Sequence, residues 1–215
     1  MRIGVLGTGM AGRVIASRLV ELGHEVRMGS RTAGNLAALD WLRHAGGPAS
    51  AGTFADAASF GEVVFNCTAG VSSLDALEAA GSTNLAGKLL VDVANPLDHS
   101  GDVPSLSVCN TDSLGEQLQR GFPEVRVVKA LNTMNCEVMV NPALIPGDHV
   151  VFVCGDDASA KEQTGALLGE FGWPPERVID LGDITAARGA EMYMPLWLRL
   201  MGPMGGWHFN IAIAR

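Results

Sequence analysis

The chain has 215 residues, of which 47% are hydrophobic and 18% are charged. This length supports one large domain, or a main domain with a small appendage, and a core that needs no disulfide or metal to fold. The net charge of −8, without a basic block in the sequence, argues against a nucleic-acid partner.

Apolar runs and segments with helical periodicity alternate along the chain. The predicted strands cover residues 3–6, 25–28, 63–65, 89–91, 125–130, 150–154 and 178–180. The predicted helices cover residues 10–22, 35–44, 56–60, 72–80, 113–120, 158–171 and 184–201, the last with a kink at Pro195. Apolar strands separated by helices are typical of parallel sheets with right-handed crossovers. We therefore predict an α/β fold: a Rossmann doubly wound parallel sheet with helices on both faces and a small C-terminal α/β extension.

The cysteines, Cys67, Cys109, Cys136 and Cys154, lie far apart, and the five histidines are scattered. These spacings argue against a metal site and indicate reduced thiols in a cytoplasmic protein. Since an apolar run follows Met1-Arg2 directly, we expect no signal peptide. Residues 192–214 carry only Arg199 as a charge, but prolines and glycines interrupt them, so we expect a buried or interface element and no membrane span.

Residues 7–12 read Gly-Thr-Gly-Met-Ala-Gly, which is a G-x-G-x-x-G motif. The motif follows the first predicted strand and opens the first predicted helix, which is the context that dinucleotide binding requires. Gly7 permits the tight turn, Gly9 lets a pyrophosphate approach the backbone, and Gly12 allows close helix–strand packing. The free amides and dipole at the helix start favour the anion. The sequence thus predicts a dinucleotide site.

The end of the second predicted strand distinguishes the two nicotinamide dinucleotides. NAD enzymes place a carboxylate there for the ribose 2′-hydroxyl, but this chain has Ser30, Arg31 and Thr32. Two hydroxyls and a guanidinium can hold a 2′-phosphate, and an Arg–phosphate bond is charge-assisted and often bidentate. We therefore predict NADP(H) as the cofactor.

Three further segments, residues 66–70, 92–96 and 130–133, follow strands whose carboxyl ends should face the nicotinamide half. Their amide and small side chains suit a flat ring, so we expect Asn95, Asn132 and Thr133 to contact the cofactor. From residue type alone, ordinary packing is the better interpretation of Cys67 and Cys136.

The chain also resembles a known family, the NADPH-dependent reductases of the deazaflavin coenzyme F420, also called F420-dependent NADP oxidoreductases. The resemblance spans nearly the whole chain. It rests on residues 7–12, 29–31, 128–133 and 153–157 and, in the tail, on Glu191, Pro195-Leu196 and Met204-Gly205.

The resemblance implies a cleft in which the two rings stack, so that hydride passes directly from nicotinamide C4 to deazaflavin C5. It places Thr8 to Ala11 at the pyrophosphate, Ser30 and Arg31 at the 2′-phosphate, and Gly70, Asn95-Pro96 and Cys136 near the nicotinamide or its ribose. The chain departs from the family at Asn35, where members can carry a basic residue, and at residues 134–136, which face the second substrate.

These arguments together give one set of predicted residues, with no catalytic side chain and no metal ligand. The predicted cofactor-binding residues are Gly7, Thr8, Gly9, Met10, Ala11, Gly12, Ser30, Arg31, Thr32, Thr68, Ala69, Gly70, Asn95, Pro96, Asn132, Thr133 and Cys136. We expect residues 1–145 to form the NADP-binding Rossmann domain and residues 146–215 a small domain that closes the cofactor cleft.

The predicted function is hydride transfer between NADPH and F420 or a flavin-like acceptor, by a homodimer whose apolar tail pairs the subunits. Two alternatives stay open. One is an NADPH-dependent reductase of a small keto acid or imine, although no Lys/Asn or Lys/Asp acid–base pair is evident. The other is a non-catalytic NADP(H)-binding module, for which the divergent residues 134–136 argue.

Overall fold

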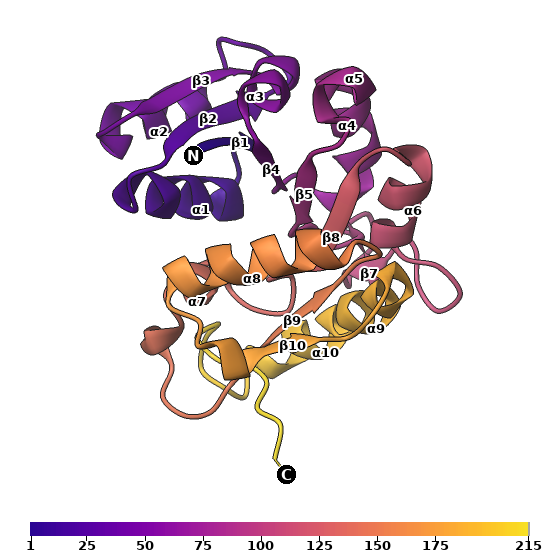
Figure 1. Ribbon diagram of the computed structural model, residues 1–215. Helices are drawn as coiled ribbons and strands as arrows, with labels where there is room; N and C mark the ends of the chain where they lie inside the picture. The colour runs from indigo at the N-terminus through magenta and orange to yellow at the C-terminus, as the bar shows by residue number, and fades with distance from the viewer. Residues whose placement is uncertain (215) are drawn as a thin grey trace.

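A single sheet of eight strands forms the centre of the computed structural model, which describes residues 1–214. The strand order is β10-β9-β8-β5-β4-β1-β2-β3 (Figure 1). These strands are β1 (Arg2–Leu6), β2 (Glu25–Ser30), β3 (Ala49–Thr53), β4 (Val63–Asn66), β5 (Leu89–Asp92), β8 (Arg126–Ala130), β9 (Val151–Cys154) and β10 (Val178–Asp180). A separate two-stranded ribbon pairs β6 (Leu97–Asp98) with β7 (Ser105–Leu106).

Helices connect the strands and cover the sheet. The α-helices are α1 (Met10–Glu21), α2 (Leu36–Ala45), α3 (Phe54–Phe60), α4 (Ser73–Ala80), α5 (Ser82–Leu85), α6 (Leu114–Gly121), α7 (Cys136–Val140), α8 (Ala158–Phe171), α9 (Ala187–Met192) and α10 (Met194–Leu200). Short 3-10 helices are η1 (Gly70–Ser72), η2 (Pro142–Leu144), η3 (Pro175–Arg177) and η4 (Ile184–Ala186).

The sheet is mostly parallel, as the sequence predicts. All neighbouring strands run parallel except β8 and β9, which pair antiparallel. The carboxyl ends of β1, β2, β4, β5 and β8 therefore meet at one edge, whereas β9 and β10 run the other way. The α/β Rossmann class is confirmed, and the C-terminal strands extend this same sheet.

Two apolar layers enclose the sheet. One packs α1, α2, α7 and α8 against it, with Ile15, Leu19 and Phe171 fully or almost fully buried. The other packs α3, α4, α5 and α6 on the opposite face. Figure 1 shows α1, α7 and α8 on one side of the strands and α4, α5 and α6 on the other. Strands buried on both faces explain the continuous apolar runs of the sequence.

One strand and one helix show how the structure differs from the sequence prediction. The segment 49–53, not predicted as a strand, forms the edge strand β3 beside β2. The helix predicted over residues 184–201 is broken into η4, α9 and α10, with Tyr193 between the last two. Pro195 lies in the first turn of α10, where its missing amide costs no hydrogen bond, so the interruption lies at Tyr193 and not at the kink predicted for Pro195.

The lengths of the helices test whether the apolar C-terminal segment could cross a membrane. The longest helix in residues 1–214 is α8, with 14 residues, and none of the helices there combines the length and apolar character needed to cross a bilayer.

Candidate functional site

The turn between β1 and α1 has the backbone geometry that the glycine motif predicts. Gly7 adopts φ of +115°, and a Cβ on it would lie 2.5 Å from the Cys67 carbonyl oxygen. A Cβ on Gly12 would lie 2.2 Å from the Gly7 carbonyl oxygen. Both positions therefore exclude any side chain, because each approaches a neighbouring backbone directly. The structure has the tight turn predicted at Gly7 and the close packing predicted at Gly12.

Gly9 differs from its two partners because it faces open space. No protein atom lies within 4 Å of where its Cβ would be. It is also the N-cap of α1 and offers no side chain to the first amides of the helix, whereas Asn35 caps α2 and Asp157 caps α8. The start of α1 thus presents uncapped N–H groups and the positive end of a helix dipole beside an open space. This arrangement can receive an anion such as a pyrophosphate.

A cavity of about 430 Å³ joins this turn to the end of β2. Gly7, Thr8, Gly9, Ser30 and Arg31 line it together with residues 67–69, so the structure brings these predicted residues together. Arg31 follows the last residue of β2, is exposed, and forms no ion pair with any carboxylate in the described chain. A free guanidinium in this place can bind a phosphate.

The other polar groups at the end of β2 are arranged around Arg31. Ser30 is buried and its Oγ donates to the Thr32 carbonyl oxygen at 2.6 Å, which shapes the loop. Thr32 is exposed but does not line the cavity. Asn35, predicted above to depart from the family pattern, lines the cavity, and its side chain accepts from the Ala38 amide at 3.1 Å as the cap of α2. The cavity lining also contains Asp75, from the first turn of α4.

A second cavity of about 400 Å³ shares Thr68 and Ala69 with the first and continues to Gly70 and Asn95. The loops after β4 and β5 touch here through their backbones. A Cβ on Gly70 would lie 2.0 Å from the Asn95 carbonyl oxygen and 2.8 Å from the Pro96 Cα. The predicted residues Gly70, Asn95 and Pro96 are therefore in direct contact with one another.

Asn95 also connects the loop after β5 to the loop after β8. Its Nδ2 donates to the Asn132 carbonyl oxygen at 2.7 Å, and the Asn132 Nδ2 donates to the Asn95 Oδ1 at 2.9 Å. Leu131, which precedes Asn132, is a buried non-glycine residue with φ of +66°. A left-handed leucine is an uncommon conformation that needs support from its surroundings. The reciprocal Asn95–Asn132 pair is such a support.

Asn132, Thr133 and Cys136 lie near this edge without lining either cavity. Asn132 and Thr133 are each 2% exposed, and Cys136 is buried as the first residue of α7. Burial is the main cause that raises the pKa of the Cys136 thiol, and burial also raises the pKa of Cys67, with a further contribution from Asp92. Both thiols are thus protonated core groups at neutral pH, as their residue type predicts.

A buried cluster of charges below this edge is absent from the sequence prediction. The Lys129 Nζ lies 2.6 Å from the Asp92 Oδ2 and 2.8 Å from the Glu191 Oε1, and all three residues are at most 1% exposed. Burial alone would lower the pKa of Lys129, but Asp92 and Glu191 outweigh that effect and raise it. Glu191 also accepts from the Leu114 and Gly115 amides at the start of α6, at 2.8 and 3.0 Å. The ammonium group is therefore charged and fully paired.

The strand register explains how these groups meet. Asn66 lies beside Asp92, and Asp92 beside Lys129, in the parallel pairs β4–β5 and β5–β8. The Asn66 Nδ2 donates to the Asp92 Oδ1 at 2.8 Å. A signal for this row exists in the sequence, because each of three buried apolar strands carries one polar residue near its carboxyl end. Glu191 gives no such signal, since it lies on a helix far away in the sequence.

A sequence profile and a solved structure show which family the chain belongs to. The sequence profile of the family described as "NADP oxidoreductase coenzyme F420-dependent" matches residues 2–96. A solved structure from Arthrobacter sp. FB24, named as a candidate F420-dependent NADP reductase, is 52% identical, covers 99% of both chains and has a TM-score of 0.93.

Two less similar proteins also match this chain. The metalloreductase STEAP3 of Rattus norvegicus is 32% identical in an alignment of 208 residues that covers 91% of this chain. This chain spans 38% of that curated relative's length. An imine reductase from Streptomyces aurantiacus is 21% identical with a TM-score of 0.67, over 94% of this chain and 62% of its own, a likeness that shows a common fold alone.

Alanine at Gly9 and at Gly12 should separate anion binding from folding. Gly9→Ala places a methyl group in the open space, so we expect a free energy of unfolding within about 0.5 kcal/mol of the original protein. We also expect its NADPH Kd to rise by about tenfold, or about 1.4 kcal/mol. Gly12→Ala forces its methyl group against the Gly7 carbonyl and should cost about 1–3 kcal/mol of stability. Urea unfolding and calorimetric NADPH titration measure both; unchanged NADPH binding in Gly9→Ala would contradict the assignment of the open space.

Proposed function

Because the chain belongs to the coenzyme F420-dependent NADP oxidoreductase family and is an NADP-dependent oxidoreductase, we propose that it transfers hydride between NADPH and coenzyme F420. The observation that carries the nucleotide half of this proposal is the unpaired Arg31 at the end of β2, in one cavity with the uncapped start of α1. The acceptor half rests on the relative that is 52% identical over 99% of both chains.

The proposed roles divide the site along the edge of the sheet. Backbone amides of residues 8–11 bind the pyrophosphate, and Ser30, Arg31 and Thr32 bind the 2′-phosphate. The nicotinamide half lies over the loops after β4, β5 and β8, which hold Thr68, Ala69, Gly70, Asn95, Pro96, Asn132, Thr133 and Cys136. The two adjoining cavities, which run from the phosphate turn to Asn95, support this division.

Hydride transfer depends on the alignment of the nicotinamide with the acceptor more than on acid–base side chains. When bound, NADPH supplies a hydride from nicotinamide C4 with its electron pair, and the acceptor needs only one further proton, which solvent can provide. The protein therefore contributes orientation and exclusion of water. Lys129, Asp92 and Glu191 have their charges paired with one another below the edge, which is why none of them is assigned as a proton donor.

The segment 146–215 completes the proposed site as a cover for the nicotinamide half. Its tail reaches the loop after β8, because the Asn210 Nδ2 lies 3.8 Å from the Met134 Sδ and donates to the Val150 carbonyl oxygen at 2.8 Å. Trp197 of α10 stacks on Phe209 with ring centroids 5.4 Å apart. Arg188 pairs with Glu116, which leaves Arg199 as the better candidate of the two for an anionic acceptor tail. The unpaired cysteines fit a cytoplasmic protein.

The same segment supports a homodimer. Met192, Leu196, Met204 and Trp207 are between 41% and 57% exposed, and such side chains are enriched in subunit interfaces. We expect light scattering to give the mass of two chains at micromolar concentration, and Leu196→Glu to shift it toward one chain. A monomeric mass for the unaltered protein would reject the dimer.

We expect Arg31→Ala to weaken the binding of NADPH without affecting the fold. Loss of a charge-assisted phosphate contact predicts a KM for NADPH raised at least several-fold and up to about 100-fold, with NADH kinetics unchanged. Arg43→Ala is the matched control, since Arg43 is exposed on α2 and pairs with Asp40 at 3.6 Å, outside the cavity. Equal NADPH kinetics in both variants would remove Arg31 from the site.

The acceptor is tested directly by mixing the protein and NADPH with F420, FMN, FAD or a ferric chelate, and with small keto acids and imines, while following NADPH absorbance. We expect the fastest turnover with F420. Faster turnover with a flavin or the ferric chelate would contradict F420 as the acceptor, and turnover of the ferric chelate would favour an activity like that of the rat metalloreductase. Turnover of an imine or keto acid alone would favour the small-substrate reductase, and tight NADPH binding without any turnover would favour a binding module.

A further inference from the structure

The contacts of Lys129 extend beyond charge pairing. Besides Asp92 and Glu191, its ammonium group donates to the Ala94 carbonyl oxygen at 2.7 Å. Ala94 is a buried residue of the loop that follows β5. Lys129 therefore holds a loop backbone as well as two carboxylates.

The same cluster holds the other side of that loop. The Ala94 amide donates to the Asp92 Oδ1 at 3.1 Å, and the Asn66 Nδ2 fixes the same oxygen from the neighbouring strand. The backbone on both sides of Ala94 is thus bonded to a buried charge. Hydrogen bonds to charged groups are stronger than those between neutral groups, so these two bonds favour one orientation of the loop.

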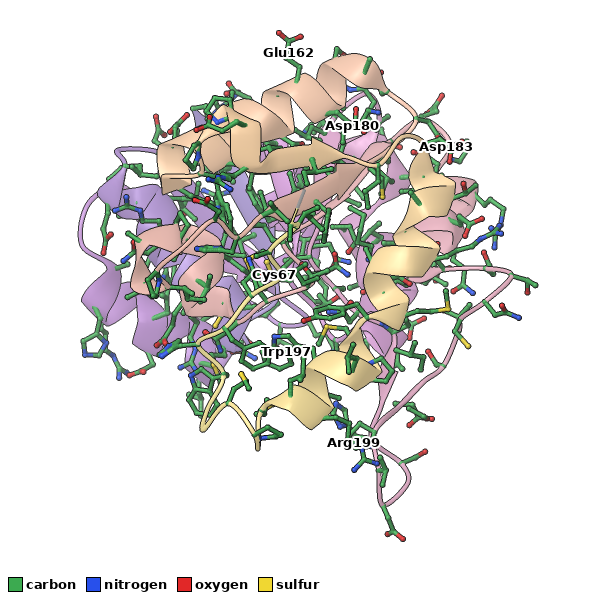
Figure 2. The ribbon with its side chains drawn as sticks, turned by 90° about the horizontal axis from the view of Figure 1, so that it is seen from below. Cys67, Glu162, Asp180, Asp183, Trp197 and Arg199 are labelled. Carbon is green, nitrogen blue, oxygen red and sulfur yellow. The ribbon has the colours of Figure 1, made fainter. Side chains whose placement is uncertain are left out.

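The next residue transmits this orientation to the edge of the sheet. Asn95 forms the reciprocal pair with Asn132, and its carbonyl oxygen contacts Gly70. Gly70 and Asn95 line the second cavity, so the position of the Ala94 carbonyl determines the shape of that cavity wall. In Figure 2, Cys67, in the loop after β4, lies near the centre of this view, whereas Asp180 and Asp183 lie toward the rim.

Stability alone does not account for such a cluster. Buried ion pairs contribute little net stability, because desolvation offsets their attraction, and apolar side chains of similar volume often serve as well. A leucine or methionine at residue 129 could fill the space but could not bond the Ala94 carbonyl. The lysine supplies both the positive charge between the two carboxylates and the bond that holds the loop.

We propose that Lys129 is a positioning residue, which fixes the Ala94 carbonyl and, through the Asn95–Asn132 pair, sets the orientation of the nicotinamide ring for hydride transfer. This inference rests on the proposed function, which places the nicotinamide over these loops.

The test compares Lys129→Met with the double variant Lys129→Met/Glu191→Gln. The double variant keeps the formal charge of the cluster at −1, because it removes one positive and one negative charge. Lys161→Met is the matched control, since Lys161 pairs with Asp180 at 2.8 Å near the far edge of the sheet. Each protein is measured by circular-dichroism melting, by calorimetric NADPH titration, by the fluorescence emission of bound NADPH, and by NADPH turnover with F420.

In at least one of the two Lys129 variants, we expect a folded protein whose kcat falls on the order of 10- to 100-fold, because a small misplacement of reacting groups has that effect. Its NADPH Kd and KM should stay within about threefold, since the phosphates bind elsewhere. Its bound-NADPH emission should shift toward that of free NADPH, and Lys161→Met should match the unaltered protein in every measurement.

Emission and kcat equal to those of the control would overturn the proposal, as would loss of folding in both Lys129 variants, because each result would leave Lys129 with a structural role alone. Should the unaltered protein turn over none of the acceptors, the proposed function fails. The emission of bound NADPH then still decides the positioning role on its own.

Discussion

The site depends on backbones that touch without side chains between them. Gly12 meets the Gly7 carbonyl, Gly7 meets the Cys67 carbonyl, and Gly70 meets the Asn95 carbonyl, with added Cβ atoms at 2.2, 2.5 and 2.0 Å from those oxygens. These contacts connect the loops after β1, β4 and β5 into one continuous surface at the carboxyl edge of the sheet. Side chains at these glycines would push the neighbouring loops apart, and the two adjoining cavities lie along the surface that the loops form.

A row of polar groups supports that surface from below. Asn66, Asp92 and Lys129 lie side by side in neighbouring strands, and Glu191 adds a bond from α9. The same Glu191 accepts from the first amides of α6, so one carboxylate connects the C-terminal segment, α6 and β8. Removing one partner of such a buried group costs about 3–5 kcal/mol, because a charge is then left unpaired. The cluster therefore couples the stability of the fold to the geometry of the edge.

The parts of the fold that the sequence predicts are those with a distinct apolar period. The strands β1, β4, β5 and β8 read as continuous apolar runs, and the glycine turn has its required context. The sequence Ala-Ser-Ala-Gly-Thr of β3 has no such pattern, because an edge strand is only half covered. The reversed direction of β9 also escapes prediction, since strands buried on both faces look alike in either direction. Contacts such as Lys129–Glu191 depend on tertiary packing, which no local period encodes.

Arg31 and Lys129 illustrate what decides the role of a cation near this edge. Both lie near the carboxyl end of a strand. Arg31 lies one residue beyond β2 and is exposed, whereas Lys129 lies inside β8, next to Asp92 of β5 on one side and Cys154 of β9 on the other. The first is free to bind a phosphate, and the second has its charge matched by Asp92 and Glu191. Position relative to the end of the strand, more than residue type, therefore separates ligand binding from support of the loops.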